Sequence, residues 1–199
     1  MSSDVRQGAT VWGASIALAL IVAAGVGACG GGSNDKAAPR RVAPSRPTST
    51  APVEDLDMKP ADFRNLALMT KVRGFFVDNR LGHLQEALRV AASPDGGVYP
   101  VGTILQLVPQ EAMVKRAKGW NPTTHDWEFF FMKTSPTGTE IVTRGATETV
   151  NRFGGNCFSC HSKSQAKWDM VCEQTHGCDP LPVSHDIIRS IQNADPRPR

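Results

Sequence analysis

The stretch Cys157-Phe158-Ser159-Cys160-His161 is the most informative part of the sequence for the fold, because a group bound to this motif has to be enclosed by the rest of the domain. A Cys-x-x-Cys-His run is the attachment signature of a c-type haem. The two thiols add to the vinyl groups of haem as thioethers, and the adjacent His161 then binds the iron from the proximal side through a neutral imidazole. The sequence therefore predicts one haem c per chain, attached through Cys157 and Cys160 and ligated by His161.

The N-terminal residues are typical of an export signal. An apolar run from Val11 to Ala28 follows a short segment carrying Arg6, and small residues precede Cys29. This context resembles a bacterial lipobox, which predicts a signal peptide over residues 1–28 and a lipidated Cys29 that anchors the chain to a lipid bilayer. An uncleaved membrane anchor is the alternative, because the run just reaches spanning length. In both cases we expect the domain in the bacterial periplasm or cell envelope.

A structural zinc site is the alternative to haem, because thiolate and imidazole candidates crowd the region. These candidates are Cys157, Cys160, His161, Cys172, His176 and Cys178. An exported chain is in an oxidising compartment, where zinc thiolates are disfavoured and paired cysteines oxidise. Each of the five cysteines then has an expected role: Cys29 carries lipid, Cys157 and Cys160 carry haem, and Cys172 and Cys178 form a disulfide.

Length and charge organise the rest of the chain. Residues 29–53 are rich in Gly, Ser, Pro and Arg without hydrophobic periodicity, which predicts a flexible tether. Residues 54–199 suffice for one core. The net charge of +3 arises outside this domain, whose 17 basic and 17 acidic residues balance. We therefore expect no nucleic-acid partner; the basic tether either contacts anionic lipid headgroups or is simply solvated.

Hydrophobic periodicity predicts an α+β order within the domain. Amphipathic helices are expected from Pro60 to about Asp78 and from His83 to Ala92. Turn residues follow, and strands are expected over Val98 to Val108, Trp127 to Lys133 and Thr139 to Thr143. The tail from Asn193 to Arg199 is expected to be disordered or draped over the surface.

The strand that begins at Trp127 is apolar on both faces. Because side chains alternate along a strand, Trp127, Phe129 and Phe131 share one face, and Phe130 and Met132 share the other. An ordinary buried strand explains this pattern, and so does a strand that lines a haem pocket. Glu128, on the same strand, is expected on an exposed face.

Four segments together resemble the cytochrome P-460 family. They are Tyr99-Pro100-Val101-Gly102-Thr103, Asp126-Trp127-Glu128-Phe129-Phe130-Phe131, the Cys157 to His161 motif, and Ala166-Lys167-Trp168-Asp169-Met170-Val171. The likeness extends over roughly Tyr99 to Val171. It implies a small antiparallel sheet with packed helices around one five-coordinate c-type haem, whose distal side faces apolar sheet residues. Family members include hydroxylamine-oxidising enzymes and the beta-type cytochromes c-prime, which bind nitric oxide, and dimers occur among them.

The chain departs from the hydroxylamine-oxidising members at their cross-linked lysine. That position falls on Leu107, and Lys115 and Lys118 follow in a segment expected to be helical or looped. The cross-link is therefore in doubt. The pattern favours binding or slow redox chemistry of a small uncharged nitrogen oxide, and, if the chain is an enzyme, a haem oxidoreductase acting on hydroxylamine or nitric oxide. The expected distal pocket walls are Leu105, Leu107, Phe129, Phe131 and Met132.

A plain electron-transfer cytochrome is the second hypothesis. It needs a sixth iron ligand, for which the candidates are Met132, Met170, His125, His176 and His185. The late position of the motif argues against a carrier, because 103 residues of the domain precede Cys157. Arg144 and Arg152 either pair with haem propionates or lie solvated at the surface. The sequence nominates no catalytic residue and no redox partner protein.

Overall fold

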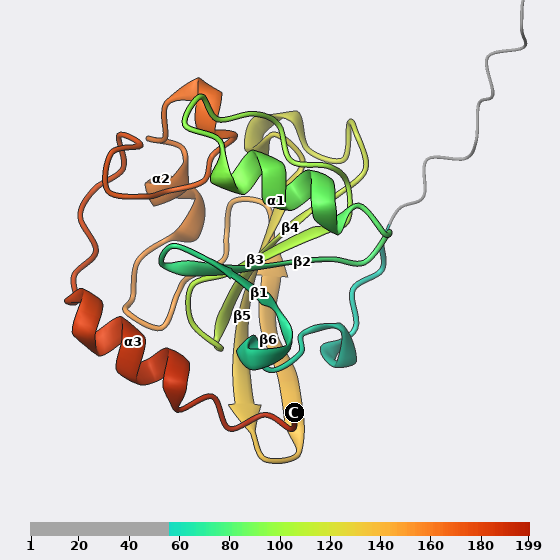
Figure 1. Ribbon diagram of the computed structural model, residues 1–199, viewed down its shortest axis with the longest axis vertical. Helices are drawn as coiled ribbons and strands as arrows, with labels where there is room; N and C mark the ends of the chain where they lie inside the picture. The colour runs from blue at the N-terminus through green and yellow to red at the C-terminus, as the bar shows by residue number, and fades with distance from the viewer. Residues whose placement is uncertain (1–55) are drawn as a thin grey trace, which may run out of the picture. The chain divides into compact units, whose positions relative to one another are not determined.

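Antiparallel β-structure dominates the computed structural model, which describes residues 56–199. These residues form one six-stranded sheet and three α-helices, which confirms the α+β class (Figure 1). The strands are β1 (Thr70–Val72), β2 (Phe75–Asn79), β3 (Thr103–Gln106), β4 (Glu111–Lys115), β5 (Trp127–Ser135) and β6 (Gly138–Gly145). The α-helices are α1 (Leu84–Ala92), α2 (Cys157–His161) and α3 (His185–Asn193). Short 3-10 turns are η1 (Pro60–Asp62), η2 (Leu66–Leu68), η3 (Pro122–Thr124) and η4 (Ala166–Trp168).

The sheet is a meander in which every strand pairs antiparallel with its neighbour along the chain, in the order β1-β2-β3-β4-β5-β6. Figure 1 shows α1 crossing one face of this sheet, and α2 lying near the same end of the molecule. Both α1 and the residues around α2 contribute to the apolar cluster on this face. The sheet therefore forms a wall against which the motif helix is placed.

The strand β5 separates two apolar clusters, as its alternation predicts. Trp127 and Phe129 lie in the main cluster together with Leu105 and Met113. Phe130 and Met132 are buried in a second cluster with residues such as Ile104 and Val114. Phe131 is only half-buried, because the β5–β6 register shifts between Phe131 and Met132. The bulge weakens the simple alternation at that point.

The helix expected from Pro60 to about Asp78 is wrong. The segment instead contains the two 3-10 turns η1 and η2, followed by the hairpin β1–β2. The left-handed φ of 50° at Arg73 makes the turn between the strands. Four of the five residues of β2 are buried, because β2 pairs on both sides, with β1 and β3. The apolar residues are spaced three and four positions apart, as in a helix, but pairing and burial within the sheet decide the structure of this segment. The expected helix near His83 is confirmed as α1.

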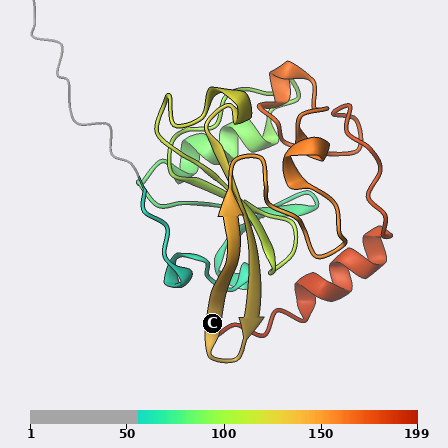
Figure 2. The same cartoon turned by 180° about the vertical axis from the view of Figure 1, so that it is seen from behind.

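The C-terminal tail lies over the surface, which was one of the two expectations for this segment, and it is held there by one buried side chain. Its anchor is Arg197, whose side chain is buried and pairs with Asp195 at 2.7 Å. The guanidinium also donates to the Phe63 carbonyl at 3.1 Å, and Asn65 donates to the Arg197 carbonyl at 2.6 Å. Figures 1 and 2 show the tail running from α3 toward the β5–β6 hairpin. The tail is thus held against the segment that contains Phe63, a residue of the second cluster.

The expected signal peptide, the lipidated Cys29 and the tether over residues 29–53 all lie outside the described residues. Within residues 56–199, the structure has no helix that is long and apolar enough to cross a membrane.

Candidate functional site

The Cys-x-x-Cys-His motif forms the short helix α2. The Asn156 side chain begins this helix by accepting a hydrogen bond from the Ser159 backbone N–H at 2.8 Å. Cys157 and Cys160 are three residues apart on this single turn, so they project from neighbouring positions of one helix face. Both are half-buried free thiols. The motif therefore presents two unpaired thiols side by side.

Burial keeps these thiols protonated. It raises the pKa of Cys157 to about 12, with the charge of Glu111 adding to the effect, and it also raises the pKa of Cys160 above the ordinary value. Thiolate is the metal-ligating form of cysteine. At neutral pH the two side chains are therefore neutral thiols rather than thiolates.

The His161 imidazole is fixed in one tautomer. Its Nδ1 lies 2.7 Å from the Met170 carbonyl oxygen, and because a carbonyl only accepts, Nδ1 carries the hydrogen. Nε2 is then left with its lone pair, as a metal-ligating histidine requires. Burial lowers the pKa of His161, and the hydrogen bond to Met170 opposes this only in part. The side chain is thus a neutral imidazole with one nitrogen available as a ligand.

The turn that presents the Met170 carbonyl is an uncommon one. Asp169 and Met170 both have left-handed backbone conformations, with φ of 50° and 64°. Three buried contacts hold Asp169: the Lys115 ammonium reaches its carboxylate at 2.8 and 2.9 Å, the Tyr99 N–H donates to the carboxylate at 2.9 Å, and the Trp127 indole N–H donates to its carbonyl at 2.7 Å. Sequence reasoning missed the Lys115–Asp169 pair, because the two residues are 54 positions apart.

Lys115 also corrects the expectation for its segment. It lies at the end of strand β4, whereas the sequence predicted a helical or looped stretch. Burial lowers the pKa of Lys115, and the charge of Asp169 opposes this shift. The ammonium additionally donates to the His125 carbonyl at 2.7 Å. The strand lysine is thus committed to Asp169 and to the turn at His125.

The disulfide expected between Cys172 and Cys178 is present, with an Sγ–Sγ distance of 2.02 Å. It closes a loop in which the buried His176 stacks on Trp168, with ring centroids 3.8 Å apart. Two of the four thiols considered as zinc ligands are therefore bonded to each other. Across residues 56–199, no group of three or more His, Cys, Asp or Glu side chains is arranged to hold a metal ion. This arrangement is unlike a closed structural zinc site.

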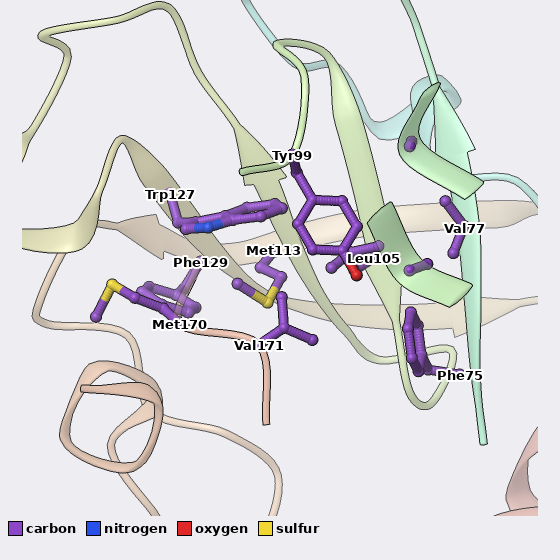
Figure 3. Close-up of a cluster of buried hydrophobic side chains, with 11 residues drawn as sticks. Phe75, Val77, Tyr99, Leu105, Met113, Trp127, Phe129, Met170 and Val171 are labelled. Carbon is purple, nitrogen blue, oxygen red and sulfur yellow. The ribbon is translucent and has the colours of Figure 1, made fainter. Parts of the chain in front are cut away.

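The expected pocket residues divide between the two faces of the sheet. Leu105 and Phe129 belong to the main cluster, and Leu107, Cys157 and Phe158 pack against it. Figure 3 shows Phe129 beside Met170 in this cluster. Met132, in contrast, lies in the second cluster, because alternation along β5 directs it to the face opposite Phe129. Phe131 lines a separate groove of about 270 Å³ with Arg152, Lys133 and Gln110.

The remaining candidates are placed as follows. Arg144 pairs with Glu128 at 2.6 Å, and Glu128 is buried where an exposed strand position was expected. Arg152 is exposed and donates to Gln110 at 3.1 Å. Among the possible sixth ligands, Met170 is buried in the main cluster, His176 is buried under Trp168, and His125 and His185 are exposed.

Comparisons of the chain with protein-family models, curated proteins and solved structures gave no significant match.

Proposed function

We propose that this chain is an exported, membrane-anchored monohaem c-type cytochrome that binds or turns over small nitrogen oxides, nitric oxide or hydroxylamine. The observation that carries the proposal is the single turn of α2, which holds two free thiols and an imidazole whose Nδ1 is occupied by the Met170 carbonyl. This donor set fits haem c, with Cys157 and Cys160 for attachment and His161 for the iron. When bound, haem c supplies an iron centre for ligand binding and one-electron chemistry.

The surroundings of α2 support a small, uncharged ligand. The main cluster supplies apolar side chains, including Leu105 and Phe129, with Leu107 packed against it. These apolar side chains exclude water from the part of the surface that they cover, as a small uncharged ligand requires. The Phe129 ring lies only 5.2 Å from the imidazole ring, centroid to centroid. Two rings that both touch a planar group between them have to be about 7 Å apart. A planar group bound at Nε2 therefore does not fit between Phe129 and His161, and it either lies beside Phe129 or displaces it.

An electron-transfer cytochrome with a sixth Met or His ligand is the alternative. Met170 lies beside Phe129 in the main cluster (Figure 3), but its own carbonyl holds Nδ1 of His161 at 2.7 Å. It therefore lies behind the proximal imidazole, whereas a sixth ligand binds the iron from the opposite side. Met132 is also a poor candidate, because it is buried in the cluster on the other face.

Covalent attachment is the first test. The full chain is exported in a bacterial host that attaches haem to c-type cytochromes, and haem is assayed on the denatured polypeptide by mass and by absorbance. We expect one haem per chain in the parent and none in the Cys157→Ser/Cys160→Ser variant. The matched control, Cys172→Ser/Cys178→Ser, removes the other cysteine pair and should keep covalent haem. A parent that carries zinc but no haem would overturn the proposal.

Coordination number then separates the two functions. The ferrous protein is examined by optical spectroscopy before and after addition of nitric oxide. A five-coordinate, high-spin spectrum that shifts on addition supports ligand binding at an open site. A six-coordinate, low-spin spectrum that does not respond supports the electron carrier. A displaced and broadened Soret band would instead indicate a lysine cross-link and hydroxylamine chemistry.

A further inference from the structure

A buried ion pair stands behind the residue that holds His161. Lys115 and Asp169 are only 5% and 3% exposed, and the ammonium lies within 2.9 Å of both carboxylate oxygens. Lys115 comes from the end of β4, which is part of the rigid sheet, whereas Asp169 lies in the loop after η4. The pair therefore ties that loop to the sheet wall.

The Lys115–Asp169 ion pair holds the turn formed by Asp169 and Met170, whose backbone conformation is unfavourable by itself. Two consecutive non-glycine residues in left-handed conformation are unfavourable, and such strain persists only where surrounding contacts determine the backbone. Around Asp169 those contacts are Lys115 and Tyr99 at the carboxylate and Trp127 at the carbonyl. The next residue, Met170, has the second left-handed conformation, and its carbonyl faces His161 Nδ1 at 2.7 Å. The direction of that carbonyl is therefore set by how Asp169 is held.

Stability alone is a weak reason for these two charges to be buried. Replacing a buried ion pair with apolar residues of similar volume is often neutral or stabilising, whereas a pair with fixed geometry specifies one arrangement of the backbone. Here the bidentate contact, the Tyr99 N–H and the indole N–H all converge on one residue. Such convergence orients a neighbouring group more closely than apolar packing does.

We propose that the Lys115–Asp169 pair positions the Met170 carbonyl and thereby fixes the tautomer and ring orientation of His161. Lys115 and Asp169 are then positioning residues for the proximal ligand. This inference rests on the proposed function for the role of His161, but the geometry it describes belongs to the polypeptide. Hydrogen bonding from Nδ1 to an acceptor also makes Nε2 a more basic ligand, so the pair tunes the imidazole as well as orienting it.

The test compares variants that remove contacts to Asp169 with a control variant that removes a buried ion pair elsewhere in the sheet. Lys115→Met and Asp169→Asn abolish the ion pair with little change in side-chain size. Trp127→Phe removes the indole bond to the Asp169 carbonyl and keeps an aromatic ring. The matched control is Glu128→Gln, because Glu128 forms a buried ion pair with Arg116, and its neighbours Trp127 and Phe129 both belong to the main cluster.

Two readouts on the purified full chain report on the imidazole itself. Nitrogen-15 spectra of the labelled histidines, recorded on the reduced carbon-monoxide form where haem is present, show how strongly the His161 Nδ1–H is hydrogen-bonded; where haem is absent, the same spectra give the tautomer. The iron–imidazole stretching frequency of the ferrous protein gives the basicity of Nε2. We expect a strongly hydrogen-bonded Nδ1–H in the parent and in Glu128→Gln. We expect a weaker Nδ1 hydrogen bond and a lower stretching frequency in Lys115→Met, Asp169→Asn and Trp127→Phe.

Unchanged His161 signals in the folded variants would overturn the inference, even if their melting temperatures fall. If Asp169→Asn does not fold, Lys115→Met and Trp127→Phe decide the outcome, because each removes one contact and leaves the carboxylate in place. A parent without covalent haem would overturn the proposed function, while the nitrogen-15 spectra of the same samples would still report the tautomer. The two failures are therefore told apart.

Discussion

Phe129 lies against His161, with ring centroids 5.2 Å apart and planes inclined at 50°. The contact joins the first part of β5 to the end of α2, so the longest strand of the described sheet touches the imidazole directly. A change in the Phe129 side chain should therefore affect both the core and any ligand that approaches His161.

The first prediction separates these two effects with a pair of adjacent aromatic residues. Phe129→Ala and Phe130→Ala each remove a ring that is almost fully buried, and each should lower the free energy of unfolding by about 3 to 5 kcal/mol. Only Phe129 faces α2, because Phe130 lies in the second cluster. We expect the ligand association rate, measured by stopped-flow with nitric oxide, to change in Phe129→Ala alone. Equal rates in both variants would place the ligand elsewhere.

The disulfide should stabilise the fold without taking part in cofactor attachment. The Cys172–Cys178 bridge closes a short loop, for which chain-entropy arguments give about 2 kcal/mol. Cys172→Ser/Cys178→Ser should lower the free energy of unfolding by that amount, as measured in denaturant melts. Treating the parent with a reductant should have the same effect, and should have none on the variant.

Stability should depend on pH through Glu111. Burial raises the pKa of this carboxyl, and the Arg152 backbone N–H opposes the shift only in part. A pKa that is higher in the folded than in the unfolded chain disfavours folding once the group ionises. This penalty is absent below the unfolded pKa of about 4.3 and is complete above the folded pKa. Glu111→Gln should therefore be more stable than the parent at pH 7 and equally stable at pH 3.

Denaturant melts at the two pH values check this prediction, with Glu148→Gln as the control. Glu148 is exposed, and hydrogen bonds from Thr147 lower its pKa, so its replacement should not stabilise the chain at pH 7. A gain for Glu111→Gln that is larger at pH 3 than at pH 7 would have the wrong sign and would contradict the assignment.

The C-terminal tail should contribute strongly to the stability of the fold, although it lies at the end of the chain. Arg197→Ala removes the partner of the Asp195 carboxylate and the donor to the Phe63 carbonyl, both in buried surroundings. Breaking a buried pair in this way costs about 3 kcal/mol or more. Arg199→Ala changes an exposed residue and should stay within about 0.5 kcal/mol of the parent. Thermal melts that show equal stability for both variants would mean that the tail is not anchored in solution.

Local patterns predicted part of the fold and of the candidate site. The helix α1, the Cys172–Cys178 pair and the alternation of β5, except at Phe131, depend on neighbours close along the chain, and the structure confirms them. The hairpin β1–β2 and the strand β4 were missed, because their identity depends on pairing with other strands rather than on their own spacing. The Lys115–Asp169 ion pair was missed for the same reason, since no local pattern connects a strand lysine with a loop 54 residues later.

The meander also sets the order in which the parts of the domain become available. Each strand pairs with its predecessor in the chain, so the sheet can grow hairpin by hairpin from its N-terminal edge, through contacts of short sequence separation that form quickly. Cys157 and Cys160 follow the last strand. During synthesis from the N-terminus, the sheet, with Trp127 and Phe129 on β5, can therefore be complete before these two thiols emerge beside it.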